Sequence, residues 1–314
     1  MTSSPNNPDR VVLVTRKTQL EELVTRFATA PQARFFLEHA GTDFVPIQSA
    51  HDTYLRALET VRKAIPRGIK VLHIDRDQVP VTEFDDDLVV ALGPDGLVSN
   101  TAKYLPTQSL IGVNPDPTQY DGILLPFAPD QAARAIDLAL NGEAALAHVS
   151  LAKAESRDGH HLLAFNDLFI GAASHVSARY ELHHGKTAER QSSSGIIVST
   201  GAGSTGWLRS VLTGARSIDA LANGRSAPSP VSHTLPWDTD DLIYCVREPF
   251  PSKVSGTTLT YGVVNSSHPL EVTSHMASGG VIFSDGIQAD AIPFETGSIV
   301  SVGVARQQAH LVVH

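Results

Sequence analysis

Residues 196–208 have the sequence IIVSTGAGSTGWL, in which an apolar run leads into a glycine-rich stretch. Gly201, Gly203 and Gly206 match G-x-G-x-x-G, the pattern of the phosphate-binding turn in Rossmann domains. Such a turn also needs a second strand, ending in an acid about 20 residues on, to hold a ribose. Residues 217–230, which follow the expected helix, show no strand pattern. We therefore reject the Rossmann interpretation of this stretch.

The same stretch is also rich in hydroxyl groups. Thr200, Ser204 and Thr205 lie where a strand is expected to enter a helix. Such a bend can present backbone N–H and side-chain O–H groups to an anion or to the edge of a base. The alternative is an ordinary strand-to-helix turn capped by Ser204.

A second stretch, residues 89–105, has the sequence VVALGPDGLVSNTAKYL. It predicts a strand, a Gly-Pro-Asp-Gly turn and a helix. Asp95, between Gly93 and Gly96, therefore lies at the carboxyl end of a strand, which is the usual ligand edge of an α/β sheet. The alternative is a β-turn, for which Pro-Asp-Gly is a common composition.

The residues around these stretches predict two domains. Residues 1–142 alternate short apolar runs with amphipathic helices, which favours an α/β domain with a parallel sheet. Residues 143–314 consist mainly of strand-like runs between polar turns, which favours a mainly antiparallel β domain. The apolar runs of the first domain are RVVLV at 10–14, IKVLHI at 69–74, DLVVALG at 87–93, SLIGVN at 109–114 and GILLPF at 122–127.

Composition limits the classes of protein to consider. The chain has 314 residues, of which 42% are hydrophobic and 18% charged, as in globular proteins. A net charge of −9 disfavours nucleic acid as a partner. We find no apolar run of membrane-spanning length and no secretory signal, and Cys245 is the single cysteine. We therefore expect a cytoplasmic protein without membrane attachment or disulfides. No histidine pair makes a chelate by itself, so we predict no protein metal site.

Together the two stretches resemble the NAD kinase family, related to the diacylglycerol and sphingosine kinases. That family has Gly-Gly-Asp-Gly-Thr after an α/β strand, and Ser-Thr-Pro-Thr-Gly-Ser-Thr-Ala-Tyr in its β domain. The matching segments appear in the same order along most of residues 87–303. They are GPDGL at 93–97, IGVNPDP at 111–117, LAFNDLFIG at 163–171, STGAGSTGW at 199–207 and VIFSDGIQAD at 281–290.

The resemblance implies a kinase that uses ATP and Mg²⁺ to phosphorylate NAD at its 2′-hydroxyl. It implies that Asp95 is the base, with Gly93 and Gly96 beside the phosphates. It also implies that residues 1–142 form a nucleotide-binding domain and residues 143–314 a domain that binds substrate or dinucleotide. A homodimer or larger homo-oligomer is implied as well. The residues expected to bind the dinucleotide are Asn166, Asp167, Thr200, Ser204, Thr205 and Trp207, and Arg190 is a candidate phosphate partner.

Three departures from the family pattern leave alternatives open. Pro94 replaces a glycine and removes an N–H donor, Leu97 replaces a threonine, and Ser194 stands where aspartate is common. The acceptor is therefore the hydroxyl of NAD or that of another sugar, nucleoside or lipid. A nucleotide-binding protein that does not transfer phosphoryl groups is the alternative from a different class.

Overall fold

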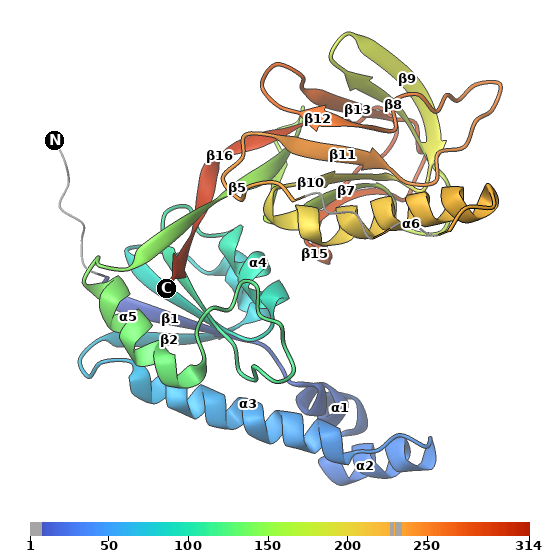
Figure 1. The fold of residues 1–314 in the computed structure, drawn as a ribbon. Coiled ribbons are helices and arrows are strands. Elements are labelled where there is room, and N and C mark those ends of the chain that lie inside the picture. The colour runs from blue at the N-terminus through green and yellow to red at the C-terminus, as the bar shows by residue number, and fades with distance from the viewer. Residues whose placement is uncertain (1–7, 227–228, 230–233) are drawn as a thin grey trace, which may run out of the picture. The chain divides into compact units, whose positions relative to one another are not determined.

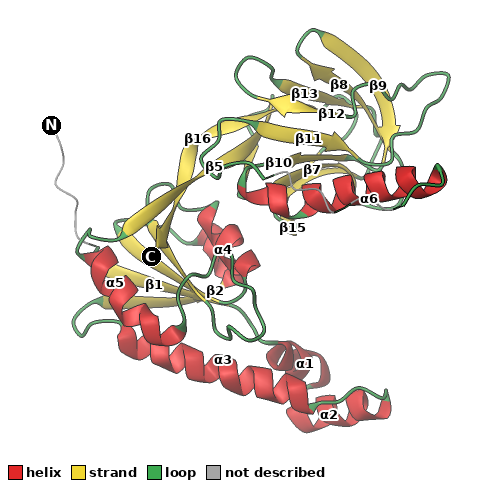
Figure 2. Ribbon diagram, in the orientation of Figure 1, coloured by secondary structure: helices red, strands yellow, loops and turns green. Residues whose placement is uncertain are grey.

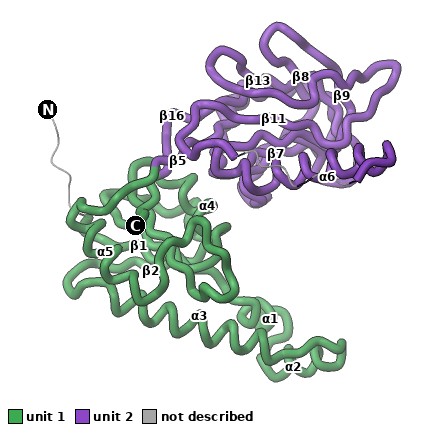
Figure 3. Tube along the Cα trace, viewed as in Figure 1, with its two compact units in different colours: residues 1–147, 310–314 green, residues 148–309 purple. Residues whose placement is uncertain are grey.

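The chain forms two compact units in a computed structural model that describes residues 8–226, 229 and 234–314. Figure 3 shows them in different colours: one is Met1–Ala147 with His310–His314, and the other is His148–Ala309. The boundary that we expect from sequence, near residue 142, lies slightly earlier than this one. The return of the last residues to the first unit is not apparent from any local pattern. The segment 217–230 lies partly outside the described residues.

The first unit contains a parallel sheet with the strand order β2-β1-β3-β4, completed by His310–Leu311 of a long final strand, β16 (Figure 1). Along the chain, β2 is placed on one side of β1, and β3 is placed on the other side. The order in which strands are added therefore reverses between β1 and β3. Such a switch point is where open α/β sheets bind ligands. The strands are β1 (Arg10–Thr15), β2 (Lys70–Asp75), β3 (Asp87–Leu92), β4 (Ser109–Val113) and β16 (Ile299–Val313).

Helices cover this sheet (Figure 2). Ala57 and Val61 of α3 pack with Ile136 of α5 and the strand residues in one apolar core, while α4 packs against β3 and β4. Thr18 caps α1 through a reciprocal capping box with Glu21, as its position before the amphipathic run predicts. The helices are α1 (Gln19–Phe27), α2 (Ala30–His39), α3 (Val45–Ala64), α4 (Asp95–Ala102) and α5 (Ala132–Leu140), with 3-10 turns at Arg76–Val81 and Pro129–Gln131.

The second unit is a sandwich of antiparallel strands, which confirms the predicted fold class. One sheet has the order β12-β11-β10-β7-β14-β15. The other contains β16-β13-β8-β9, with β5 paired to β16 and β6 paired to β5. Side chains from both sheets form one core. The strands are β5 (Ala145–Ser156), β6 (His161–Ala164), β7 (Asp167–Ala172), β8 (Ala178–His184), β9 (Thr187–Ser193), β10 (Ile196–Ser199), β11 (Leu242–Val246), β12 (Tyr261–Val264), β13 (Leu270–Ser274), β14 (Gly280–Ser284) and β15 (Ile287–Pro293).

The apolar run at 196–199 is the central strand β10, which is antiparallel to both of its neighbours, β7 and β11. Ile196 and Val198 face the sandwich core, and α6 (Trp207–Ala222) packs on the same sheet through Leu208 against Ile243. Because β10 is covered on both faces, its sequence is continuously apolar rather than alternating. A strand between antiparallel neighbours does not open a βαβ unit, so the structure agrees with the rejection of a Rossmann turn.

One apolar run of the first unit does not form a strand. Within 122–127 (GILLPF), the backbone forms turns, and Phe127 makes a single isolated bridge to Val113. Our prediction of a strand there is wrong because Leu124 and Leu125 are buried by packing within a loop, while Ile123 is exposed. Burial alone can thus produce an apolar run without a sheet.

Candidate functional site

The bend at residues 165–167, in the second unit, is held in place by a carboxylate from a distant part of the sequence. Asp285, in the turn between β14 and β15, accepts backbone N–H groups from Phe165 (2.9 Å), Asn166 (2.6 Å) and Asp167 (3.2 Å). Three consecutive N–H groups converging on one anion fix the local backbone. The Asn166 side chain is half-buried and forms no hydrogen bond with a described residue, so its amide is available to a ligand.

Thr200 joins this bend to the end of β10. Its backbone N–H donates to the Asn166 carbonyl oxygen (2.9 Å), and its hydroxyl donates to the Phe165 carbonyl oxygen (2.6 Å). The same hydroxyl accepts the Gly203 N–H (3.1 Å). Thr200 is fully buried, so its side chain organises the bend from within.

The glycines of the 199–207 segment allow its backbone to approach other segments closely. A Cβ on Gly203 would lie 2.1 Å from the Asn166 carbonyl oxygen, and one on Gly201 would lie 1.9 Å from that of Pro236. Ser204 is buried; its hydroxyl donates to the Gly201 carbonyl oxygen (2.7 Å) and accepts the Leu235 N–H (3.1 Å). These glycines therefore serve tight packing between protein segments.

An aromatic stack lies beside this bend. Trp207, the first residue of α6, stacks on Phe169 of β7 with ring centroids 5.8 Å apart and planes inclined by 17°. Phe169 stacks in turn on Phe283, and the Arg247 guanidinium lies 5.4 Å from the Trp207 centroid. Trp207 is only half-buried, so part of its surface is open to a planar ligand. Thr205 of the 199–207 segment is exposed, and its hydroxyl is open to a ligand, unlike those of Thr200 and Ser204.

Asp167 begins β7, opposite Ser199 of β10, and is buried. Its Oδ1 has no hydrogen-bond partner among the described residues. Burial raises the pKa of the Asp167 carboxyl to about 7; the Ser199 hydroxyl opposes this shift, and the nearby Asp285 carboxylate adds to it. Buried carboxyl groups with perturbed pKa values are common in functional sites.

In the first unit, Asp95 lies at the carboxyl end of β3, as the first residue of α4. Its Oδ1 accepts the Leu124 N–H at 2.7 Å, and Oδ2 forms no hydrogen bond with a described residue. Gly96 is exposed beside it, whereas Leu97 is buried and packs against Gly93. The helix thus begins with one oriented carboxylate that keeps an open oxygen.

The loop that supplies the Leu124 N–H is organised by Asn114. The Asn114 amide donates to the Tyr120 carbonyl oxygen (3.1 Å), and its oxygen accepts the Asp116 N–H (3.0 Å). Gly112 of β4 lets the loop approach, since a Cβ there would lie 2.2 Å from the Leu124 carbonyl oxygen. The position of the Asp95 carboxylate therefore depends on residues of the next strand and its loop.

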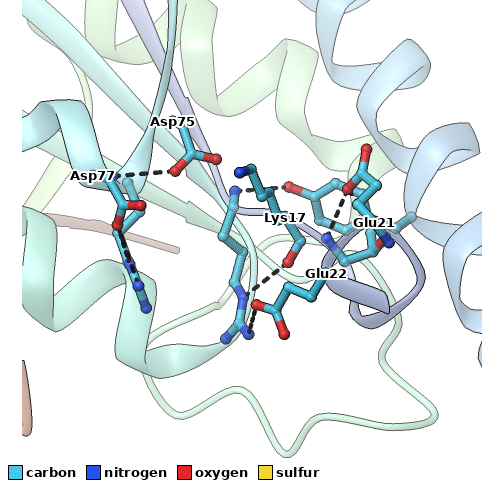
Figure 4. A network of polar contacts seen from close by, with 9 residues as sticks. Lys17, Glu21, Glu22, Asp75 and Asp77 are labelled. Carbon is cyan, nitrogen blue, oxygen red and sulfur yellow. Dashed lines mark hydrogen bonds and ion pairs between the residues drawn. The ribbon is translucent and has the colours of Figure 1, made fainter. Parts of the chain in front are cut away.

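A cavity of about 520 Å³ lies within the first unit at the carboxyl ends of β1, β3 and β4. Its lining includes Arg16 and Lys17 after β1, Pro94 after β3, and Tyr54 of α3. Figure 4 shows the loop around Lys17 with Glu21 and Glu22 on one side and Asp75 and Asp77 at the end of β2. Burial raises the pKa of Tyr54 to about 12, so its hydroxyl stays neutral and donates to the Leu92 carbonyl oxygen (3.0 Å).

The sequence reasoning did not identify this cavity. The signal that could have found it is topological: Arg16 and Lys17 follow the first strand of a doubly wound sheet, next to the switch point. The Lys17 side chain forms no ion pair with a described residue, and Arg16 lies 3.9 Å from Glu22. Two cations at this edge are suited to a phosphate group.

Arg190 is not part of the cluster around Asn166. It lies on β9, in the other sheet of the sandwich, and lines a cavity with Arg179 and His275. Asn166, Asp167, Thr200 and Ser204 lie together, as the predicted set implies. Within the described part of the chain, no group of three or more His, Cys, Asp or Glu side chains could hold a metal ion.

Known proteins are similar to this chain in fold and, in part, in sequence. The structure of yeast NADH kinase complexed with NADH matches 98% of this chain and 84% of its own, with a TM-score of 0.58 and 15% identity. An NAD kinase from Archaeoglobus fulgidus in complex with ATP matches 96% of this chain and 93% of its own, with a TM-score of 0.54 and 17% identity.

A curated NAD kinase from Chlorobium phaeobacteroides is 32% identical over 135 residues. In that segment the chain is similar to an NAD kinase in sequence, and over its whole length it is similar to NAD and NADH kinases in fold. The aligned residues make up 41% of this chain, and the chain spans about half of the curated relative, 46% of its length. No family model matches the chain. Every helix in the described part is too short or too polar to cross a lipid bilayer.

Proposed function

We propose that this chain is an ATP-dependent kinase that transfers a phosphoryl group to the 2′-hydroxyl of NAD. The observation that supports it most directly is the Asp95 carboxylate, oriented by the Leu124 N–H and open at its second oxygen. A base in this position accepts the proton of an acceptor hydroxyl. The similarity to an NAD kinase over 135 residues supports NAD as the acceptor.

The proposed reaction uses positioned groups rather than covalent chemistry. The acceptor O–H bond breaks as its oxygen bonds to the γ-phosphorus, and the proton passes to Asp95. The bond between the γ-phosphorus and its bridging oxygen breaks, which releases ADP. Arg16 and Lys17 contact the phosphates of the donor. Mg²⁺ bound to the triphosphate would offset the rest of its charge.

In this proposal the dinucleotide contacts groups that the second unit leaves open. The Asn166 amide and the Thr205 hydroxyl form hydrogen bonds to a base edge or ribose, and Trp207 stacks on a ring. Thr200 and Ser204 shape this surface from inside rather than by contact, since their hydroxyls are bonded to the backbone. Asp167 is buried beside Asn166, so in this proposal it also acts from beneath the surface.

The test is an assay with ATP, Mg²⁺ and NAD that measures NADP. We expect Asp95→Asn to lower the rate of NADP formation by about 10²–10⁴-fold, because general-base catalysis contributes on that scale. Binding of NAD, measured by calorimetry, should persist in this variant. Asp130→Asn, which changes an exposed carboxylate in the same unit, is the matched control. Absence of NADP with any phosphoryl donor would overturn the choice of NAD.

A second function is favoured by the turn at residues 93–97. Pro94 has no N–H, and Leu97 is buried where the related family has a threonine, so this turn has fewer donors for phosphates. A nucleotide-binding protein without phosphoryl transfer is consistent with that loss. Calorimetry distinguishes the two, since binding of NAD or ATP without turnover supports this second function. A panel of hydroxyl acceptors with labelled ATP tests other substrates, and self-association stays a prediction.

A further inference from the structure

A second polar cavity, of about 420 Å³, lies in the second unit and shares no lining residue with the Asn166 bend. Its base is the outer face of the hairpin formed by β8 and β9. The basic residues of its lining are Arg179, Arg190 and His275, and none of the lining residues is acidic. In a chain of net charge −9, such a concentration of positive side chains is notable.

The two arginines lie on the same face of the hairpin. Arg179 pairs with Ser192, and Arg190 pairs with Glu181, so the arginines are diagonal neighbours, roughly 7–8 Å apart at their backbones. Neither guanidinium forms a hydrogen bond or ion pair with a described residue. Glu181 contacts His183 instead, at 3.5 Å. Two like charges at this spacing repel each other, and an anion between them removes the repulsion.

One wall of the cavity is the segment 250–256, which runs beside β9. The Phe250 N–H donates to the Ser192 carbonyl oxygen (2.8 Å), and the Gly256 N–H donates to that of Arg190 (2.9 Å). Ser252 closes the segment internally, because its hydroxyl accepts the N–H groups of Val254 (3.2 Å) and Ser255 (3.1 Å). Hydrogen bonds to β9 and within the segment therefore hold this wall in place.

The attachment of this wall continues beyond Gly256. A Cβ on Gly256 would lie 2.4 Å from the Glu189 carboxylate, so a side chain there would displace Glu189. The same carboxylate accepts the N–H groups of Thr258 (3.0 Å) and Leu259 (3.2 Å). A site that is organised before binding loses less conformational entropy when the ligand arrives.

The chemistry of the lining identifies a class of ligand. A guanidinium fork matches the oxygens of a phosphate group, and two forks match a diphosphate. Phe250 and Val254 line the same cavity and are 62% and 80% exposed, so an apolar surface lies beside the cations. We propose that this cavity binds a phosphate-bearing small molecule through Arg179 and Arg190, separately from the site that contains Asn166.

The first test is calorimetric titration of the full chain with pyrophosphate. We expect Arg179→Ala and Arg190→Ala each to weaken binding at least tenfold, because each removes a charge-assisted contact. Arg306→Ala, which removes an exposed arginine from β16 of the same unit, should leave the affinity unchanged. ADP in place of pyrophosphate shows whether a nucleoside adds affinity, and Phe250→Ala should abolish only that addition. Affinity within twofold of the wild type in the double arginine variant would overturn the proposal.

A second measurement needs no variant. Phenylglyoxal modifies accessible arginines, and mass spectrometry locates the modified residues. Pyrophosphate should protect Arg179 and Arg190 from modification and should not protect Arg306. Equal protection of all three arginines from modification would contradict the proposed binding site. Both measurements report binding alone, so a chain that fails to phosphorylate NAD would still give a clear result.

Discussion

At the scale of single residues, several positions of the 199–207 segment serve the interior of the protein. Thr200 and Ser204 have the hydroxyl groups that the sequence pattern offers to a ligand, yet both hydroxyls bond to backbone atoms. Gly203 has no space for a side chain because the Asn166 carbonyl oxygen occupies that position. The accessible chemistry is left to Asn166, Thr205 and Trp207.

Gly203→Ala tests this tight packing. We expect a loss of about 1–3 kcal/mol in the free energy of unfolding, because the new Cβ displaces the Asn166 backbone. Gly214→Ala is the matched control: a Cβ there meets nothing within 4 Å, and alanine should stabilise α6 by up to about 1 kcal/mol. Urea unfolding measures both. Equal effects of the two substitutions would show that the bend tolerates a side chain.

At the scale of elements, Asp95 depends on a strand and a loop that follow it. α4 begins at Asp95, β4 provides Gly112, and the loop after β4 provides the Leu124 N–H. Asn114 gives that loop its shape through bonds to Tyr120 and Asp116. The orientation of the carboxylate is therefore a property of the β3-α4-β4-loop arrangement rather than of the turn at residues 93–97 alone.

Gly112→Ala should disturb this arrangement. The added Cβ would lie 2.2 Å from the Leu124 carbonyl oxygen, so the loop must move and the Asp95 carboxylate loses its partner. Given the proposed kinase activity, we expect kcat to fall by about 10²-fold, the scale of a 1 Å misplacement, with a smaller change in KM for NAD. Gly303→Ala, in β16, meets nothing within 4 Å and should behave as the wild type. Unchanged kcat in the Gly112 variant would show that the loop does not position Asp95.

At the scale of the whole molecule, burial of Asp167 links stability to pH. Its pKa in the folded state is raised to about 7, so between the ordinary pKa of an aspartate and pH 7 the folded chain holds a proton that the unfolded chain has lost. The unfolded state then binds fewer protons, and stability falls as pH rises. Above pH 7 both states are ionised, and this contribution is constant.

We expect this carboxyl to reduce the free energy of unfolding by up to about 1.4 kcal/mol per pH unit between pH 5 and 7. Asp167→Asn keeps the shape of the side chain and removes its titration. Urea unfolding gives the free energy of unfolding of the wild type and of the variant at several pH values. The difference between the two isolates the effect of Asp167, because other titrating groups contribute equally to both proteins. A difference that does not change with pH would contradict a raised pKa at this position.

Local patterns predicted the elements whose burial is regular. Leu20, Leu23, Val24 and Phe27 repeat at helical spacing, and α1 forms there with Thr18 as its cap. The apolar runs at 10–14, 69–74, 87–93 and 109–114 form β1 to β4, and the run at 196–199 forms β10. Local patterns did not predict α2, β5 or β9. In β9 the charged residues Glu189 and Arg190 interrupt the alternation of apolar and polar residues that marks a strand.

The sequence by itself determined the fold class, the two kinds of sheet and the segments that contain candidate site residues. These features depend on periodicity and composition, which act over a few neighbouring residues. The tertiary structure decided which polar groups remain open, since Thr200 bonds to Phe165, Asp285 to Asn166, and Leu124 to Asp95. These contacts join residues far apart in the chain, and no local pattern encodes which donor will meet which acceptor once the segments pack.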